Sequence, residues 1–216
     1  MIGEGKFPRK NTSDAQHWEE VYTRNAPEAL PWNAGGPDSD LVRLVKEGVI
    51  SAGGSGLPAG RQALDIGTGP GHDAVFLIQQ GFNVIGIDIS STAIKLAREN
   101  ASQAGLFGFF QEGDIRHIPV EDQFIDFAND RGCFHVLELQ DRPKAINEVH
   151  RVLKKGGLYF LRVFSDKEPA GEGPHRFARK ELEDLFESKF KIRQFWESAL
   201  EGSRKPKSYC LLMEKK

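Results

Sequence analysis

The sequence has little excess charge and few cysteines. Its 29 Lys and Arg residues nearly balance its 31 Asp and Glu residues, which gives a formal net charge of -2. So balanced a chain has no overall positive field to attract nucleic acid or an anionic membrane, and we expect neither as a partner. The two cysteines, Cys133 and Cys210, lie in apolar segments without metal-ligand spacing. We therefore expect two buried thiols and no metal site.

Long hydrophobic runs are also missing. No stretch approaches the roughly 18 consecutive apolar residues of a membrane span. The opening segment MIGEGKFPRKNTSD lacks the apolar run of a secretory signal. These absences predict a cytoplasmic protein. The length of 216 residues predicts a single domain. The oligomeric state stays open.

The N-terminal quarter of the chain has its own character. Residues 1–12 mix Gly, Pro and basic residues without periodicity, which predicts a flexible N-terminus. Residues 13–60 contain a short aromatic helix and a second amphipathic helix that begins after a capping residue, Asp38 or Ser39. The glycine-rich stretch at 51–60 then predicts a surface loop.

From residue 61 to the end, at 216, short apolar runs alternate with helical patterns. The predicted strands are ALDI, NVIGID, FGFFQEGD, FIDFAND, LYFLRVFS, KIRQFWES and SYCLLMEK. Helices are expected between the first five, including one at about 142–153 that Gly156-Gly157 would close. The last two strands are joined by a turn too short for a helix. The pattern predicts an α/β fold with a doubly wound, mostly parallel seven-stranded sheet and a C-terminal antiparallel hairpin.

The most informative stretch is LDIGTGPGHDAVFLIQQGFNVIGIDIS, residues 64–90. It contains a strand, a loop with Gly67, Gly69 and Gly71, a helix, a second strand and Asp88 at that strand's end. This order predicts a nucleoside-binding crevice, in which Asp88 would have both carboxylate oxygens free for ribose hydroxyls. The alternative is a purely structural turn, since glycine turns are common in α/β proteins.

The spacing of this loop favours one class of ligand. It reads G-x-G-x-G with Asp65 two residues before the first glycine, whereas the dinucleotide pattern is G-x-G-x-x-G. An acid at this point would face a cationic group well and would repel a pyrophosphate. S-adenosylmethionine carries an amino group and a sulfonium and no phosphate, so the loop favours it over NAD.

Four segments together resemble a known family. LDIGTGPG, the acid in IDIS, Asp114-Ile115 in EGDIRHIP and NEVHRVLKKGGLYFL look like the successive motifs of class I S-adenosylmethionine-dependent methyltransferases. WEEVY, PW and NDRGCFH resemble the thiopurine methyltransferase and TehB-like small-molecule group. The resemblance runs from Gln62 to the C-terminus and implies a Rossmann-like methyltransferase fold. It also implies an enzyme that transfers a methyl group from S-adenosylmethionine to a small-molecule acceptor.

The resemblance also implies roles for single residues. Asp65 and the loop glycines would flank the methionine moiety, Asp88 would hold the ribose, and Asp114 would accept from the adenine amino group. The implied cofactor-binding residues are Trp18, Trp32, Asp65, Gly67, Thr68, Gly69, Gly71, Asp88, Ile89, Asp114, Ile115, Asp130 and Arg131. Residues 13–60 would form a helical lid, with Trp18, Tyr22 and Trp32 over the site.

Two residues are the candidates for catalysis. Arg131 could stabilise an anionic acceptor or pair with a cofactor carboxylate. His135 follows the fourth strand and could exchange a proton near neutral pH, although a histidine there is more often packed in the core. Cys133 is interpreted as packing. A base is optional in methyl transfer from a sulfonium, because a thiol or another soft nucleophile can react already ionised, whereas a phenol or amine needs help in losing its proton. The absence of an obvious dyad therefore favours a thiol or another soft nucleophile as acceptor.

Two other functions stay open at this point. One is an NAD-dependent oxidoreductase on the same kind of sheet, and the other is a nucleoside-binding module that has lost catalysis. A nucleic-acid or protein methyltransferase ranks lower, because the sequence has no basic stripe for phosphate contacts. It also has NDRG after the fourth strand in place of an Asn/Asp-Pro-Pro-aromatic tetrapeptide.

Overall fold

The computed structural model describes residues 14–53, 60–171 and 173–216. The predicted flexible N-terminus at 1–12 and most of the predicted loop at 51–60 lie outside the described residues. Within the described part of the chain, no helix is long and apolar enough to cross a membrane, and no cluster of His, Cys, Asp and Glu is arranged to hold a metal ion.

Seven strands form one sheet, in the order β3-β2-β1-β4-β5-β7-β6. The strands are β1 (Gln62–Ile66), β2 (Asn83–Asp88), β3 (Phe109–Glu112), β4 (Ile125–Arg131), β5 (Leu153–Phe164), β6 (Phe190–Ala199) and β7 (Lys207–Lys215). The first five are mutually parallel, and β7 lies antiparallel between β5 and β6. The predicted sheet with its C-terminal hairpin is confirmed.

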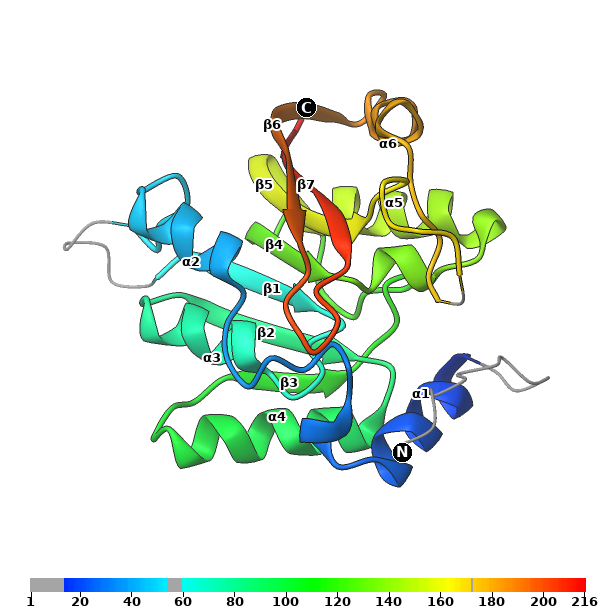
Figure 1. Ribbon diagram of the computed structural model, residues 1–216. Helices are drawn as coiled ribbons and strands as arrows, with labels where there is room; N and C mark the ends of the chain where they lie inside the picture. The colour runs from blue at the N-terminus through cyan, green and yellow to red at the C-terminus, as the bar shows by residue number, and fades with distance from the viewer. Residues whose placement is uncertain (1–13, 54–59, 172) are drawn as a thin grey trace.

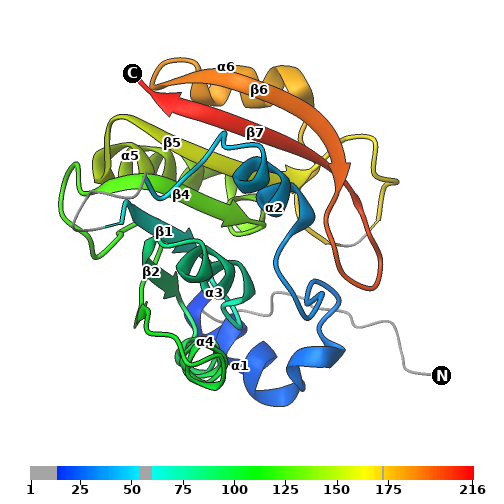
Figure 2. The ribbon, with the colours of Figure 1, turned by 90° about the vertical axis from the view of Figure 1, so that its left-hand side faces the viewer.

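Helices cover both faces of the sheet (Figures 1 and 2). They are α1 (Asp14–Arg24), α2 (Ser39–Lys46), α3 (His72–Gln79), α4 (Ser91–Gln103), α5 (Arg142–Val152) and α6 (Arg179–Phe186), with 3-10 turns η1 (Pro27–Ala29), η2 (Phe134–Val136) and η3 (Leu139–Asp141). Helices α2, α3 and α4 share one apolar core with the sheet, and α5 and α6 share another on the opposite face. The central strands β1 and β4 are thus buried on both sides, as their continuous apolar runs predicted, whereas the edge strands β3 and β6 stay partly exposed.

The predicted helix at about 142–153 is observed as α5, but the role predicted for Gly156-Gly157 was wrong. Gly156 and Gly157 do not close α5, which ends at Val152, and they lie inside β5. Leu153 pairs with Ile125 and Leu158 with Phe127, so the residues between Leu153 and Leu158 bulge out of the ladder. The bulge lets Leu153 and Leu158 both pair with β4, on either side of the polar Lys-Lys-Gly-Gly segment. Within that segment the chain turns at Gly156, which has a φ of 75°.

The N-terminal segment divides between two locations. Helix α1 packs on α4 through a small cluster that contains Val21, Tyr22 and Ala93. Helix α2 instead contributes Leu41 and Leu44 to the same core as α3 and α4, and Asp38 caps it by accepting from the Leu41 amide at 3.1 Å. The segment at 13–60 is therefore not one packing unit, since α2 is continuous with the main core.

Gly71 is a position in the loop after β1 where a side chain would both strain the backbone and clash with α4. It has a φ of 82°, and a Cβ added there would lie 2.9 Å from the Ala97 Cβ on α4. We expect Gly71→Ala to lower the free energy of unfolding by about 3 kcal/mol, from the left-handed backbone and the clash together.

The matched control is Gly105→Ala, where φ is 69° and nothing lies within 4 Å of the added Cβ. That variant should lose only about 1 kcal/mol, for the backbone alone. Urea unfolding of both variants measures the difference. Equal losses would mean that the contact between the loop and α4 is not tight.

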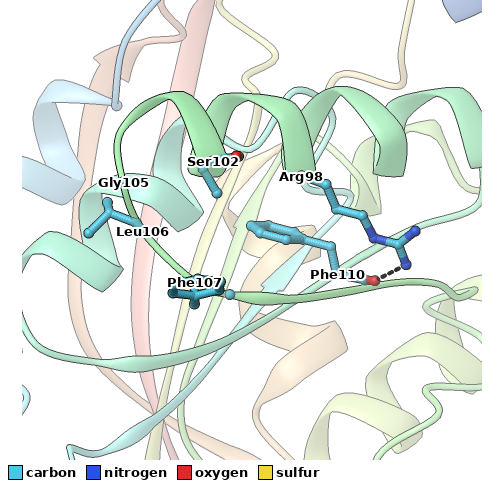
Figure 3. A pocket seen from close by; sticks show the side chains of 8 residues that line it. Arg98, Ser102, Gly105, Leu106, Phe107 and Phe110 are labelled. Carbon is cyan, nitrogen blue, oxygen red and sulfur yellow. Dashed lines mark hydrogen bonds between the residues drawn. The ribbon is translucent and has the colours of Figure 1, made fainter.

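One hollow lies far from the carboxyl ends of the strands. A cavity of about 290 Å³ opens between α4 and the start of β3, lined by Arg98, Ala101, Ser102, Gly105, Leu106, Phe107, Gly108 and Phe110 (Figure 3). Arg98 donates to the Phe110 carbonyl across it at 2.5 Å. Phe107 beside it is 97% exposed. None of the predicted site residues lines this cavity.

Candidate functional site

The glycine loop leaves the carboxyl end of β1 and is covered from two directions. A Cβ at Gly67 would lie 2.7 Å from the Cys133 Cβ, and one at Gly69 would lie 2.8 Å from the Tyr22 hydroxyl. Gly67 and Gly69 also have positive φ values of 64° and 52°. The loop therefore tolerates no side chain at these positions. Cys133 is half-buried, so the expectation of two buried thiols holds only for Cys210. Desolvation nevertheless raises the pKa of the Cys133 thiol well above its usual range.

Asp88 ends β2 beside the glycine loop, as predicted. The expectation that both its carboxylate oxygens are free was wrong, because one accepts the Gly69 amide at 2.9 Å and the other the Ser90 amide at 3.0 Å. Each oxygen keeps one lone pair for a further donor. Burial raises the pKa of Asp88 to about 6, since no cationic side chain forms an ion pair with it in the described residues.

This pKa gives a pH-dependent prediction. The pKa of Asp88 rises from 3.8 to about 6 on folding, so the folded state holds this proton more tightly. The cost is absent below about pH 4 and complete above about pH 6. Relative to Asp88→Asn, the wild-type protein should therefore lose up to about 3 kcal/mol of stability between pH 4 and pH 7. Urea unfolding of both proteins across this range tests it, and a constant difference would contradict it.

Asp65 lies at the end of β1 in a polar network that sequence analysis did not foresee. Its carboxylate accepts from Thr68 Oγ1 at 2.6 Å and from Asn129 Nδ2 at 2.7 Å. Asn129 also donates to Asp73 at 3.1 Å, and the fully buried Arg162 donates to Asn129 Oδ1 at 2.7 Å. Burial, with the nearby Asp73 carboxylate, raises the pKa of Asp65 to about 7. The network fixes Asp65 through neutral donors.

One signal for this network was present in the sequence. Arg162 stands inside the apolar run LYFLRVF, and a charged residue in a buried strand almost always has a buried partner. The partners Asp38 and Asp73 come from α2 and α3, far away in sequence. Only the packing of those helices on the sheet brings them together.

Asp114 follows β3, and its carboxylate accepts hydrogen bonds from Arg116. Arg116 binds both of its carboxylate oxygens, at 2.6 to 3.0 Å, and also reaches Asp14 and Asp141 at 2.9 Å each. These hydrogen bonds hold the pKa of Asp114 below its usual range against the effect of burial. Arg116 thereby connects α1, the loop after β3 and η3. Ile115, beside Asp114, is buried in the core under α5.

Asp130 and Arg131 point to different surroundings. Asp130 is fully buried, accepts the amides of Cys133 and Phe134, and accepts from the Tyr159 hydroxyl at 3.1 Å. Its carboxylate therefore holds the turn after β4. Arg131 donates to the carbonyls of Trp32 and Glu201, at 2.9 and 3.0 Å.

The turn between β6 and β7 is a part of the site that sequence analysis did not consider. Its Ser203 amide donates to the Pro31 carbonyl at 3.0 Å, and Arg131 bonds the neighbouring Glu201 carbonyl. Figure 1 shows this turn reaching toward the N-terminal segment. The N-terminal segment, β4 and the C-terminal hairpin therefore meet at Arg131.

His135, the predicted acid/base, is buried on η2. The Phe164 amide donates to its Nδ1 at 3.2 Å, which leaves the proton of the neutral ring on Nε2. Burial lowers the pKa of His135 to about 3, so the ring is neutral at pH 7. In this arrangement the ring can donate a hydrogen bond, but neither nitrogen has a free lone pair for taking a proton.

The aromatic residues of the N-terminal segment form one cluster, and its Tyr22 hydroxyl reaches the glycine loop at Gly69. Trp18 and Trp32 are in edge-to-face contact, with ring centroids 5.6 Å apart, and Tyr22 is buried beside them. Glu19 attaches α1 to the start of α4, accepting from Ser90 and Thr92 at 2.6 to 3.1 Å. These bonds lower the pKa of Glu19 to about 2. Helix α1 is thus attached at Ser90 and Thr92, two and four residues after Asp88.

The chemistry of this donor set suits a particular ligand. Asp65 and Asp88 are buried carboxylates beside the glycine loop, and neither forms an ion pair with a basic side chain in the described residues. Carboxylates in that state favour a ligand that brings a cation and hydroxyl donors, and they disfavour a pyrophosphate. The amino group, sulfonium and ribose of S-adenosylmethionine meet this requirement.

Comparison with known proteins identifies the family. Residues 63–157 match a family model described as a methyltransferase domain. The chain is 30% identical over 171 residues to "Probable thiol methyltransferase 2" of Arabidopsis thaliana, covering 78% of this chain and 70% of that protein. It is 27% identical over 186 residues to 2-heptyl-1-hydroxyquinolin-4(1H)-one methyltransferase of Mycobacteroides abscessus, covering 83% and 75%.

Solved structures agree on the fold. A chain from a study of the "Conversion of a Disulfide Bond into a Thioacetal Group during Echinomycin Biosynthesis" matches with a TM-score of 0.79 at 24% identity, over 93% of this chain and 92% of that chain. TehB from Haemophilus influenzae matches with a TM-score of 0.68 at 20% identity, over 92% and 67%. Both named relatives are methyltransferases, which argues against the oxidoreductase alternative. The chain belongs to the class I S-adenosylmethionine-dependent methyltransferases, enzymes whose cofactor is S-adenosylmethionine.

Proposed function

We propose that the protein methylates a small acceptor through a soft atom that is ionised before it reacts, with a thiol as the leading class. The observation that supports this most is the state of His135, whose Nδ1 lone pair is engaged and whose pKa burial holds near 3. Without a base at that position, an acceptor that is already ionised at neutral pH has the advantage. Two relatives of about 30% identity are named as thiol and thiocyanate methyltransferases.

We further propose which residues hold the cofactor. The cofactor supplies an activated methyl group on its sulfonium. Asp88 would accept the ribose hydroxyls on its two remaining lone pairs, and Asp65 with the glycine loop would face the amino end. Of the other predicted contacts, Thr68 orients Asp65, and Trp18 and Trp32 close the site with α1. The proposed lid is residues 14–32, narrower than the expected 13–60 because α2 belongs to the main core.

The main role of the chain in the reaction is then to hold the cofactor and the acceptor in line and to exclude water. Tyr22, Trp18 and Trp32 shield the glycine loop from water, and Arg131 ties the segment at Trp32 to β4 and to the β6–β7 turn. Holding two reactants in line is worth up to about 7–11 kcal/mol in well-oriented systems. No proton transfer by the enzyme is required when the acceptor arrives ionised.

An acceptor panel tests the proposal. Transfer of labelled methyl from S-adenosylmethionine should be measured to hydrosulfide, thiocyanate, an aromatic thiol, the matching phenol and the matching aniline. We expect the sulfur acceptors to have kcat/KM values at least about tenfold above the phenol and aniline, and the thiol rate to follow its thiolate fraction with pH. A preference for the phenol would contradict the soft-acceptor class and would point to a hydroxyl acceptor.

The variant His135→Asn tests whether His135 acts as a base in the reaction. Asn can place its Oδ1 where Nδ1 now accepts from the Phe164 amide, so His135→Asn should keep kcat/KM for the thiol within about threefold. His135→Leu is the matched control, since it leaves the Phe164 amide unpaired and should cost about 1–3 kcal/mol of stability. If His135→Asn folds normally but loses 100-fold or more in kcat, His135 takes part in the chemistry.

A further inference from the structure

Asp65, Asn129 and Arg162 form a row across three neighbouring strands. Asp65 on β1 is in register with Asn129 on β4, and Asn129 is in register with Phe160 on β5, two residues before Arg162. All three side chains therefore lie on the same face of the sheet, at the carboxyl ends of the strands. Arg162 also covers the Phe160 ring at 4.4 Å, which sets the position of its guanidinium.

The row fixes which way the Asn129 amide points. Arg162 Nη2 donates to Asn129 Oδ1 at 2.7 Å, so this oxygen must face β5. The amide nitrogen consequently faces Asp65, to which it donates at 2.7 Å. Arg162 thus sets the orientation of Asn129, and Asn129 sets one of the two bonds that orient Asp65.

The carboxylates around this row differ in their cationic partners. Arg162 forms ion pairs with Asp38 at 2.5 Å and with Asp73 at 3.1 Å, and Arg131 lies 3.8 Å from Asp38. Asp65 receives hydrogen bonds only from the neutral Thr68 and Asn129 side chains in the described part of the chain. Among the residues that the structure describes, no guanidinium contacts Asp65, in contrast to Asp38 and Asp73.

We propose that Asn129 and Arg162 are positioning residues that present the Asp65 carboxylate to the cationic amino group of the cofactor. The inference rests on the proposed cofactor site and adds to it residues of β4 and β5 that do not touch the ligand. Arg162 neutralises Asp38 and Asp73, so that Asp65 alone is left to pair with an incoming ammonium. A buried carboxylate without a cation is costly, and the ligand relieves that cost only if it carries the ammonium.

Three ligands separate this role from a merely structural one. S-adenosylhomocysteine has both the amino and carboxyl groups, its decarboxylated form has only the amino group, and 5′-methylthioadenosine has neither. We expect Asn129→Ala to lower the affinity for S-adenosylhomocysteine and for its decarboxylated form by at least about tenfold, measured by calorimetry. The affinity for 5′-methylthioadenosine should change by less than threefold. Arg162→Lys keeps the charge without the forked geometry, and it should weaken the same two ligands.

Tyr159→Phe is the matched control, because it removes a buried hydrogen bond, to Asp130, from the opposite face of β5. It should alter all three affinities by the same small factor. Equal weakening of all three ligands by Asn129→Ala and Arg162→Lys, with folding verified by circular dichroism, would overturn the inference. If the wild-type protein bound 5′-methylthioadenosine as tightly as S-adenosylhomocysteine, the placement of the amino group at Asp65 would itself be wrong, a failure of the proposed site.

Discussion

Asp88→Ala should lower the affinity for S-adenosylhomocysteine by at least about 100-fold while the fold survives. The variant removes a charged acceptor from two ribose hydroxyls, and hydrogen bonds to charged groups contribute about 1.5–3 kcal/mol each. Removing a buried carboxylate whose pKa is raised to about 6 should offset part of the stability lost when the Gly69 and Ser90 amides are freed. Calorimetry measures the affinity, and urea unfolding measures the stability.

Glu112→Ala is the matched control for this variant. Glu112 ends β3 directly beside Asp88 in the parallel register, but its side chain is exposed. Its removal should leave the affinity within about threefold and the stability nearly unchanged. If Asp88→Ala binds the ligand as tightly as this control, the ribose is held elsewhere.

Arg162→Met should be the most destabilising single substitution of a charged residue in this protein. It leaves Asp38 and Asp73 buried without their shared cation, and breaking a buried ion pair from one side costs about 3–5 kcal/mol. For a chain of this size the thermal midpoint should fall by roughly 6–20 °C. Differential scanning calorimetry measures it, and adding Asp73→Asn to the variant should recover part of the loss.

Lys154→Met provides the comparison on the same strand. Lys154 pairs with Asp126 at 2.8 Å, but its side chain is 44% exposed. Exposed pairs contribute about 0–1 kcal/mol, so the midpoint should fall by no more than about 4 °C. Similar shifts for Arg162→Met and Lys154→Met would show that the buried network adds little to stability and that hydrophobic packing could replace it.

Features that depend on residues close together in sequence were predictable. The glycine loop and the acid at the end of β2 each lie within one strand-turn-helix unit, and the cap at Asp38 directly precedes α2, so local backbone rules operate at all three. The hairpin was predictable because its turn is too short for a crossover. The location of Gly156 and Gly157 inside β5 was not predictable, since the bulge at 154–157 depends on pairing with β4.

The state of each site residue depended on distant neighbours. Asp88 and Asp114 were located correctly after their strands, but sequence gave no sign that Asp88 binds the Gly69 amide or that Arg116 occupies Asp114. His135 was the best histidine by position, yet the Phe164 amide from β5 determines which ring nitrogen carries the proton. A protonation state is a property of the surrounding atoms, and those come from other elements.

The sequence by itself determined the order of strands and helices along the chain, the glycine loop beside the acid at the end of β2, and hence the family. Those features follow from periodicity and backbone conformation, which act over a few residues. Only the tertiary structure decided that Asp38, Asp73, Asn129 and Arg162 meet behind Asp65, and that α1 is fastened over the loop by Glu19 and Arg116. Buried charges need partners, and the chain supplies them from segments up to 124 residues apart because the sheet brings its carboxyl ends together.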